Sequence, residues 1–85
     1  MIVRFLQWLF NLNRSVNYYA YINSPAWKNI ARRCKVKAGM RCKRCGKSGT
    51  FYSLHAHHVT YSRLGHERLS DLECLCAECH ERVSR

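Results

Sequence analysis

The sequence CKRC at residues 42–45 and the sequence CAEC at residues 76–79 decide the fold of this chain. Each C-x-x-C turn presents two thiolates together, and zinc favours four such ligands in a closed tetrahedral site. Gly46, directly after the first pair, permits the tight backbone that turns amide N–H groups toward sulfur. A redox-active pair is the competing interpretation, but neither pair lies in a thioredoxin-like strand–helix–strand context. We therefore predict one structural zinc ion with four ligands, which are Cys42, Cys45, Cys76 and Cys79.

The composition indicates a small, basic, folded domain. A chain of 85 residues buries only roughly 60% of its unfolded surface, so its core alone is marginal and a metal staple is expected. Fifteen Lys and Arg against five Asp and Glu give a formal net charge of +10. This imbalance favours a polyanionic partner, either nucleic acid or an anionic membrane surface. The hydrophobic content of 47% excludes a disordered basic tail.

The N-terminal segment, residues 1–23, is predicted to be an amphipathic helical segment that precedes a domain at residues 24–85. Residues 11–17 read as a break within it. Its apolar part, residues 1–12, is too short and too polar to span a bilayer, and no export cleavage site follows. We expect it to pack on the domain, with no stable membrane association; attachment to a membrane surface is the alternative. The lack of an export signal predicts a reducing cytoplasm, where disulfides are disfavoured.

A second helix is predicted between residue 24 and the first cysteine pair. Ser24 is a favourable N-cap, Pro25 suits the first helical position, and Gly39 is placed to end the helix. Cys34 lies on the apolar stripe of this helix. We expect Cys34 and Cys74 to be buried as small hydrophobic side chains rather than to bind metal.

The C-terminal half alternates between predicted strands, loop and helix. Residues 51–58 and 71–76 read as strands, residues 60–70 as a loop and residues 77–85 as a final helix. Histidines gather in this half, namely His55, His57, His58, His66 and His80. Neutral imidazole binds divalent ions, and imidazole near pH 7 is a good general base. A metal, a base and a basic surface together indicate metal-assisted hydrolysis of a phosphodiester.

The stretch LHAHHVTYSRLGHE at residues 54–67, followed by DLECLCAECH at residues 71–80, resembles the HNH endonucleases. It is most similar to the small phage-type members with two zinc knuckles, which the sequence SPAWK at residues 24–28 also resembles. The resemblance implies an α+β chain, with a small zinc-stapled ββα-metal domain preceded by one or two N-terminal helices. It also implies a metal-dependent endonuclease that nicks double-stranded DNA as a monomer. The expected setting is a bacterial host cytoplasm, with the protein encoded by a phage or a bacterium.

The resemblance also implies roles for particular residues. His57 and His80 would hold one catalytic divalent ion, which could be Mg²⁺, Mn²⁺, Ni²⁺ or Zn²⁺. His58 would be the general base that activates water. Asp71 would hold the active-site loop and orient the base, unless it merely closes a turn.

Three features depart from the family pattern. Asp71 stands where the family usually has Asn, and Ser84 stands where many relatives have a further histidine. Strict strand alternation would place His57 and His58 on opposite faces, so their cooperation requires the strand to end or twist at that pair. The alternative function is therefore a non-catalytic, zinc-dependent nucleic-acid-binding module with a degenerate site.

The other polar residues near these positions have less specific expected roles. Glu67 would orient a histidine, pair with Arg63 or remain a solvated charge, while His55 and His66 are expected to be bystanders. Tyr61 would contact DNA or pack beneath the loop. The cations expected to contact DNA are Arg32, Arg33, Lys35, Lys37, Arg41, Lys43, Arg44, Lys47 and Arg63. With so few acidic residues in the chain, the clusters at residues 32–37 and 41–47 are expected to lack acidic partners and to track phosphates.

Overall fold

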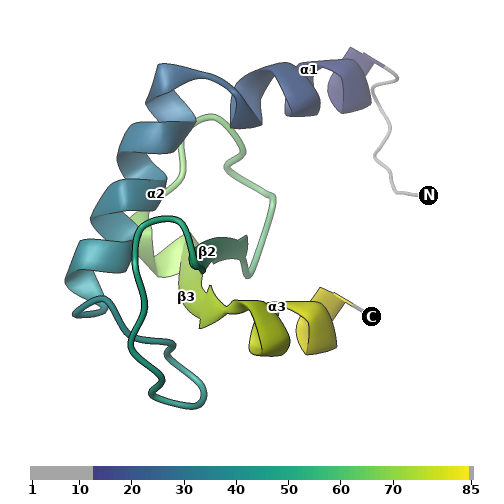
Figure 1. Ribbon diagram of the computed structural model, residues 1–85. Coiled ribbons are helices and arrows are strands. Elements are labelled where there is room, and N and C mark those ends of the chain that lie inside the picture. The colour runs from purple at the N-terminus through teal and green to yellow at the C-terminus, as the bar shows by residue number, and fades with distance from the viewer. Residues whose placement is uncertain (1–12, 85) are drawn as a thin grey trace.

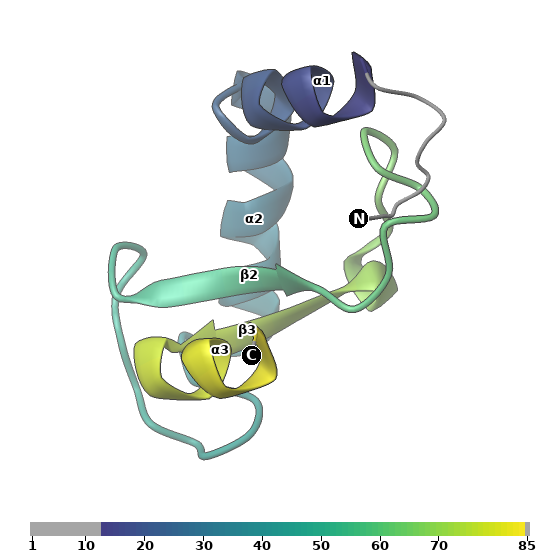
Figure 2. The same ribbon diagram turned by 90° about the vertical axis from the view of Figure 1, so that its right-hand side faces the viewer.

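Two antiparallel strands lie between helices in the computed structural model, which describes residues 13–84 of the chain (Figure 1). The elements in chain order are α1 (Asn13–Ile22), α2 (Pro25–Lys37), β2 (Leu54–His58), the 3-10 helix η1 (Leu69–Asp71), β3 (Leu72–Cys76) and α3 (Ala77–Ser84). Two strands followed by a short helix, with further helices before them, confirm the predicted α+β class. Figure 2 shows α2 behind the strands and α3 in front of them.

Helix α2 begins and ends where the sequence predicts. The side-chain oxygen of Ser24 accepts a hydrogen bond from the amide of Trp27 at 3.2 Å, and Pro25 occupies the first turn. At the other end Gly39 has a φ of 71°, a left-handed conformation that glycine adopts without the steric cost of a Cβ. Local signals at its two ends therefore define this helix.

The register of the sheet sends alternate side chains to different helices. Leu54 pairs with Cys76 and His58 with Leu72, so strand β2 continues through both adjacent histidines. The side chains of Leu54 and His58 lie on the α2 side, whereas His57 lies on the α3 side. Strict alternation is therefore kept at the histidine pair.

The strands are shorter than predicted. Residues 51–53 form a turn instead of a strand, because the Thr50 and Ser53 hydroxyls bond to each other and to neighbouring amides. Residue 71 closes a 3-10 turn and does not begin β3. At residues 51–53 and at residue 71, short-range hydrogen bonds therefore form a turn where the alternating pattern of the sequence predicts a strand.

The core is small and divided into two parts. One part packs Cys34 and Cys74 with Leu54 and Leu72, against partly buried side chains that include Trp27. The prediction that Cys34 and Cys74 are buried is confirmed, and burial raises the pKa of Cys34 to about 11. The second part consists of Cys42, Leu75, Cys76 and Cys79, with Val83 packed against them. Cysteine side chains therefore take the place that larger hydrophobic residues hold in bigger domains.

Helix α1 corrects the break predicted at residues 11–17, since its first turn begins at Asn13. It contacts the segment between the strands, because the Tyr21 hydroxyl donates to Glu67 and the Tyr18 ring lies 6.0 Å from that of Tyr61. The apolar part predicted for residues 1–12 lies outside the described residues. Within residues 13–84, no helix has the length and apolar character needed to cross a bilayer. The boundary between residues 23 and 24 stays a prediction.

The loop between the strands is closed by a buried carboxylate. Asp71, only 2% exposed, accepts hydrogen bonds from Arg63 Nε at 2.8 Å and Arg63 Nη2 at 2.5 Å. The amide of Arg68 adds a third bond at 3.0 Å. Hydrogen bonds from Arg63 and from the Arg68 backbone lower the pKa of Asp71 to about 2. This clasp ties the middle of the loop to its C-terminal end.

We expect the Asp71–Arg63 contact to give a coupling free energy in a double-mutant cycle of Asp71→Asn, Arg63→Gln and the double variant. Because the pKa of Asp71 is depressed from about 3.9 in the unfolded chain, its contribution is present above about pH 4 and lost as the pH falls toward 2. The coupling, measured by chemical unfolding, should therefore be equal at about pH 5 and about pH 8. Additive losses at both pH values would contradict the clasp.

Candidate functional site

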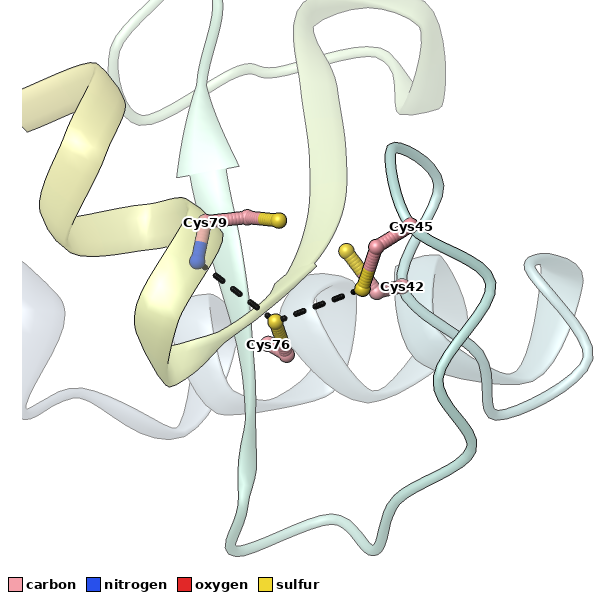
Figure 3. A group of neighbouring side chains, drawn as sticks. All are labelled: Cys42, Cys45, Cys76 and Cys79. Carbon is pink, nitrogen blue, oxygen red and sulfur yellow. Dashed lines mark hydrogen bonds between the residues drawn. The ribbon is translucent and has the colours of Figure 1, made fainter.

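Four cysteine side chains converge where the first C-x-x-C turn meets the junction of β3 and α3. The sulfur atoms of Cys42, Cys45, Cys76 and Cys79 all lie within 4.8 Å of one another. Figure 3 shows them directed into one shared space, two from the loop before β2 and two from the strand–helix junction. Cys45 lies at the exposed edge, while the other three are buried. The predicted set of four metal ligands is therefore brought together in space.

The spacing of the sulfur atoms fits a tetrahedral ion. Cys45 Sγ and Cys76 Sγ lie 3.7 Å apart. Four Zn–S bonds of about 2.3 Å at tetrahedral angles would place neighbouring sulfurs about 3.8 Å apart. Thiolate ligands also suit zinc better than they suit Mg²⁺ or Ca²⁺. The donor set and its geometry thus fit a structural zinc ion.

The backbone around the thiols supports this arrangement. The amide of Gly46 donates to the carbonyl of Cys42 at 2.9 Å, which closes the first turn at the predicted glycine. Gly46 has a φ of 78°, so a side chain at this position would be strained. In the second turn, the amide of Cys79 donates to Cys76 Sγ at 3.5 Å. Both turns are therefore held in shape by bonds of their own backbone.

The pKa values of two of these thiols, Cys42 and Cys79, are shifted in opposite directions. Burial alone would raise the pKa of Cys42, but hydrogen bonds from neighbouring backbone and thiol groups lower it to about 6. Burial and the adjacent thiols raise the pKa of Cys79 to about 12. Four thiolates in so small a space repel one another, and a divalent cation removes that repulsion.

A pocket of about 290 Å³ opens beside the sheet, between α2 and α3. Side chains from all three helices, both faces of β2 and the following loop line it, among them Tyr18, Trp27, Lys35, His55, His57, His58, Tyr61 and His80. The pocket therefore reaches both adjacent histidines, although alternation directs them to different helices.

His57 and His80 meet on the α3 side of this pocket. Their ring centres lie 5.4 Å apart with an interplanar angle of 77°. Two imidazoles bound to one tetrahedral ion through bonds of about 2.0–2.1 Å would have ring centres roughly 5 Å apart. Burial and the nearby charge of His80 lower the pKa of His57, which favours the neutral, metal-binding form at pH 7. The pair is spaced as two ligands of a single ion would be.

His55 packs flat against His80 instead of joining this pair. Their rings are 4.6 Å apart and within 6° of parallel. Stacked, parallel rings cannot both direct an in-plane lone pair at one ion, so His55 limits the rotation of the His80 ring. His55 lies two residues before His57 in strand β2, so alternation places the two side chains on one face, and this spacing is visible in the sequence.

His58 occupies very different surroundings. Its side chain is 4% exposed, and its Nε2 lies 2.7 Å from Oε2 of Glu67. The rings of Trp27 and Tyr61 each lie 4.7 Å from its ring, at 16° and 24° to its plane. Sequence reasoning left Glu67 with three possible roles and did not connect Trp27 with a histidine. No sequence signal links Trp27 to His58, because the contact spans two elements.

Asp71 is not among the residues that line this pocket. Its carboxylate contacts Arg63 and the amide of Arg68. Among the described residues, the carboxylate that contacts an imidazole nitrogen of His58 is that of Glu67. Ser84 ends helix α3 and is exposed.

Several of the predicted DNA-contacting cations have acidic partners, which corrects the expectation that none would. Arg44 pairs with Glu73 at 3.2 Å, and Lys47 pairs with Glu78 at 3.6 Å. The amide of Lys43 donates to the carbonyl of Cys74, which holds the first C-x-x-C turn beside β3, so acids far along the chain reach these cations. Other cations contact the turn after the first cysteine pair, with Arg32 4.1 Å above the Phe51 ring and Lys35 Nζ 2.9 Å from the Phe51 carbonyl oxygen. The exposed cations Arg33, Lys37 and Lys43 complete the basic surface.

The fold and the site together define a zinc-knuckle ββα domain. The family model of the HNH endonucleases matches residues 42–85, just over half of the chain. The chain therefore belongs to the HNH endonuclease family, whose members are typically nucleases that act on DNA. Comparisons with the curated proteins and with the solved structures found no significant match.

Removing the metal should unfold the domain, because metal binding of this kind contributes about 10 kcal/mol or more to folding. We expect native mass spectrometry to find one zinc ion per chain at the four-cysteine site, and a strong chelator to abolish the helical far-UV signal. Cys79→Ser should do the same without chelator. Cys34→Ala, which changes a buried cysteine outside the site, should keep the ion. An unchanged far-UV spectrum after complete removal of zinc would contradict the proposal that the four-cysteine zinc site stabilises the fold.

Proposed function

We propose that this protein is a metal-dependent DNA endonuclease that hydrolyses phosphodiester bonds at the histidine pocket. The observation that carries the proposal is the perpendicular pair of His57 and His80, whose ring centres lie 5.4 Å apart at the pocket wall. Membership of the HNH family supports the same reaction class. A basic chain with a metal-binding histidine pair suits a polyanionic substrate.

In this proposal His57 and His80 hold one divalent ion, which could be Mg²⁺, Mn²⁺, Ni²⁺ or Zn²⁺. Such an ion stabilises negative charge on the scissile phosphate and on the leaving 3′ oxygen. His55 keeps the His80 ring in its plane through their stacking contact. Lys35, which also lines the pocket, adds a positive charge for a neighbouring phosphate.

His58 is the proposed general base. It lines the same pocket as the histidine pair, and Glu67 occupies its Nε2. Its Nδ1 is then the nitrogen that accepts a proton from the attacking water. The proposed role of Asp71 is to hold the loop through Arg63, which keeps Glu67 and Tyr61 close to the His58 ring.

The proposed substrate is double-stranded DNA, and the proposed product is a nick made by a monomer, since one pocket cuts one strand at a time. The proposed setting is the cytoplasm of a bacterial host, with the gene carried by a phage or by the bacterium. The exposed cations of α2 and the first C-x-x-C turn, Arg33, Lys37 and Lys43, would lie along the phosphate backbone.

The second candidate is a zinc-dependent nucleic-acid-binding module without catalysis. The low exposure of His58 and its bond to Glu67 favour it, since a general base must reach water. Asp71 also departs from the family pattern, since the family usually has Asn at this position and the Asp71 carboxylate binds Arg63. The two candidates differ in one property, which is metal-dependent strand cleavage.

We expect the wild-type chain to nick supercoiled plasmid when Mg²⁺, Mn²⁺ or Ni²⁺ is supplied. His80→Ala should remove an ion ligand, and His58→Ala should lower the nicking rate by about 10²- to 10⁴-fold, the usual contribution of a general base. His66→Ala is the matched control, because His66 is exposed in the loop, and it should nick at the wild-type rate. DNA binding without metal-dependent nicking in the wild type would favour the module instead.

DNA affinity should fall steeply with ionic strength. For four or five phosphate contacts, the association constant should drop by about 10²- to 10³-fold between roughly 50 and 200 mM salt. Arg33→Ala should lower the slope of log K against log salt by about one. Asn29→Ala, an uncharged change on an exposed position of the same helix, should leave the slope unaltered. Affinity independent of salt, measured by fluorescence anisotropy, would contradict a phosphate-tracking surface.

A further inference from the structure

A buried carboxylate–imidazole pair joins strand β2 to the loop that follows it, and the imidazole, His58, lines the pocket. Glu67 and His58 have side chains that are only 1% and 4% exposed, and their Oε2 and Nε2 atoms lie 2.7 Å apart. Burying a carboxylate costs more free energy than a single ion pair ordinarily returns. Fixing one orientation of the imidazole is therefore a better reason for this pair than stability.

The bonds of Glu67 identify which nitrogen of His58 carries a hydrogen. Burial alone would raise the pKa of Glu67, but hydrogen bonds from the Tyr21 hydroxyl and the His58 ring outweigh it and leave the pKa below its ordinary value. An ionised carboxylate only accepts hydrogen bonds. Both contacts therefore require donors, and on the imidazole that donor is Nε2–H.

The His58 ring is also held against rotation. Trp27 of α2 stacks on it at 4.7 Å, and Tyr61 of the loop stacks on it at the same distance. Together with the bond to Glu67, these contacts fix both the plane of the ring and its rotation within that plane. In the neutral ring so held, the free lone pair belongs to Nδ1.

The carboxylate of Asp71, which the resemblance assigns to orienting the base, contacts Arg63 and the amide of Arg68 in this structure. Both oxygens of Asp71 accept hydrogen bonds from Arg63, and one of them also accepts from the Arg68 amide. Glu67 lies four residues earlier, and Tyr21 supports its other oxygen from helix α1. Tyr21 lies outside residues 42–85, the range that the family model matches.

We propose that Glu67 is the positioning residue of the pocket, with Tyr21 as its support. Glu67 holds His58 as the Nε2–H tautomer, so that Nδ1 takes the proton when a water O–H bond breaks and the oxygen forms its bond to phosphorus. The 3′ oxygen leaves with the electron pair of the broken P–O bond. The positive imidazolium formed in this step faces the negative carboxylate of Glu67. This inference rests on the proposed nuclease function for its chemistry, but the tautomer is a property of the chain alone.

The first measurement uses the zinc-loaded full chain without substrate. Long-range ¹H–¹⁵N correlation spectra assign the tautomer of each histidine, and we expect His58 to carry its hydrogen on Nε2. A hydrogen on Nδ1 would overturn the proposal whether or not the protein cuts DNA. A chain with the Nε2–H tautomer but no nicking activity would overturn the nuclease function and the catalytic use of Glu67, while the positioning of the ring would stand.

The second measurement compares Glu67→Gln with Glu78→Gln in the plasmid-nicking assay. Gln keeps the size of the side chain but lacks the charge that fixes the ring and faces the imidazolium. We expect kcat to fall by about 10- to 100-fold in Glu67→Gln, with KM for DNA unchanged. Glu78 is an exposed acid paired with Lys47, so the same change there should leave kcat unaltered. An unchanged kcat in Glu67→Gln, or a rise in KM alone, would overturn the proposal.

Discussion

The convergence of four thiols from two distant turns is the constraint on which the rest of this small structure depends. The two turns enclose the segment that holds both strands and the connecting loop. The second turn is also the start of helix α3, so His80, directly after Cys79, is carried to the face of β2 where His57 lies. Binding of one tetrahedral ion by the four thiols would therefore stabilise the core. The same arrangement places His80 at the pocket.

Buried polar contacts shape the loop between the strands. Asp71 is bound by Arg63, and Glu67 by His58 and Tyr21, so each buried carboxylate has donors for its oxygens. Polar pairs of this kind add little net stability, since desolvation offsets the attraction, but they reject alternative loop conformations in which a charge would be unpaired. The loop is thus specified by hydrogen bonds.

The pocket extends beyond the part of the chain that defines the family. Residues 42–85 supply the thiols and the histidines, whereas α1 and α2 also line the pocket, through Tyr18 and Trp27. Trp27 stacks on His58, so helix α2 contributes both a basic outer surface and an aromatic contact inside. The N-terminal helices are therefore structural parts of the candidate site, and differences in them offer a route to different properties on a shared metal-binding frame.

The sequence by itself determined the elements whose signals are local. The cap at Ser24 and the glycine after α2 set the ends of that helix, and the spacing of the cysteines identified all four metal-ligand candidates. The tertiary structure alone decided which partner each polar side chain met. Glu67 met His58, and Glu73 met Arg44, because those contacts depend on strand register and on the path of a loop, which no periodicity encodes. Capping and chelating turns act over three or four residues, whereas a buried ion pair joins residues that only the folded chain makes neighbours.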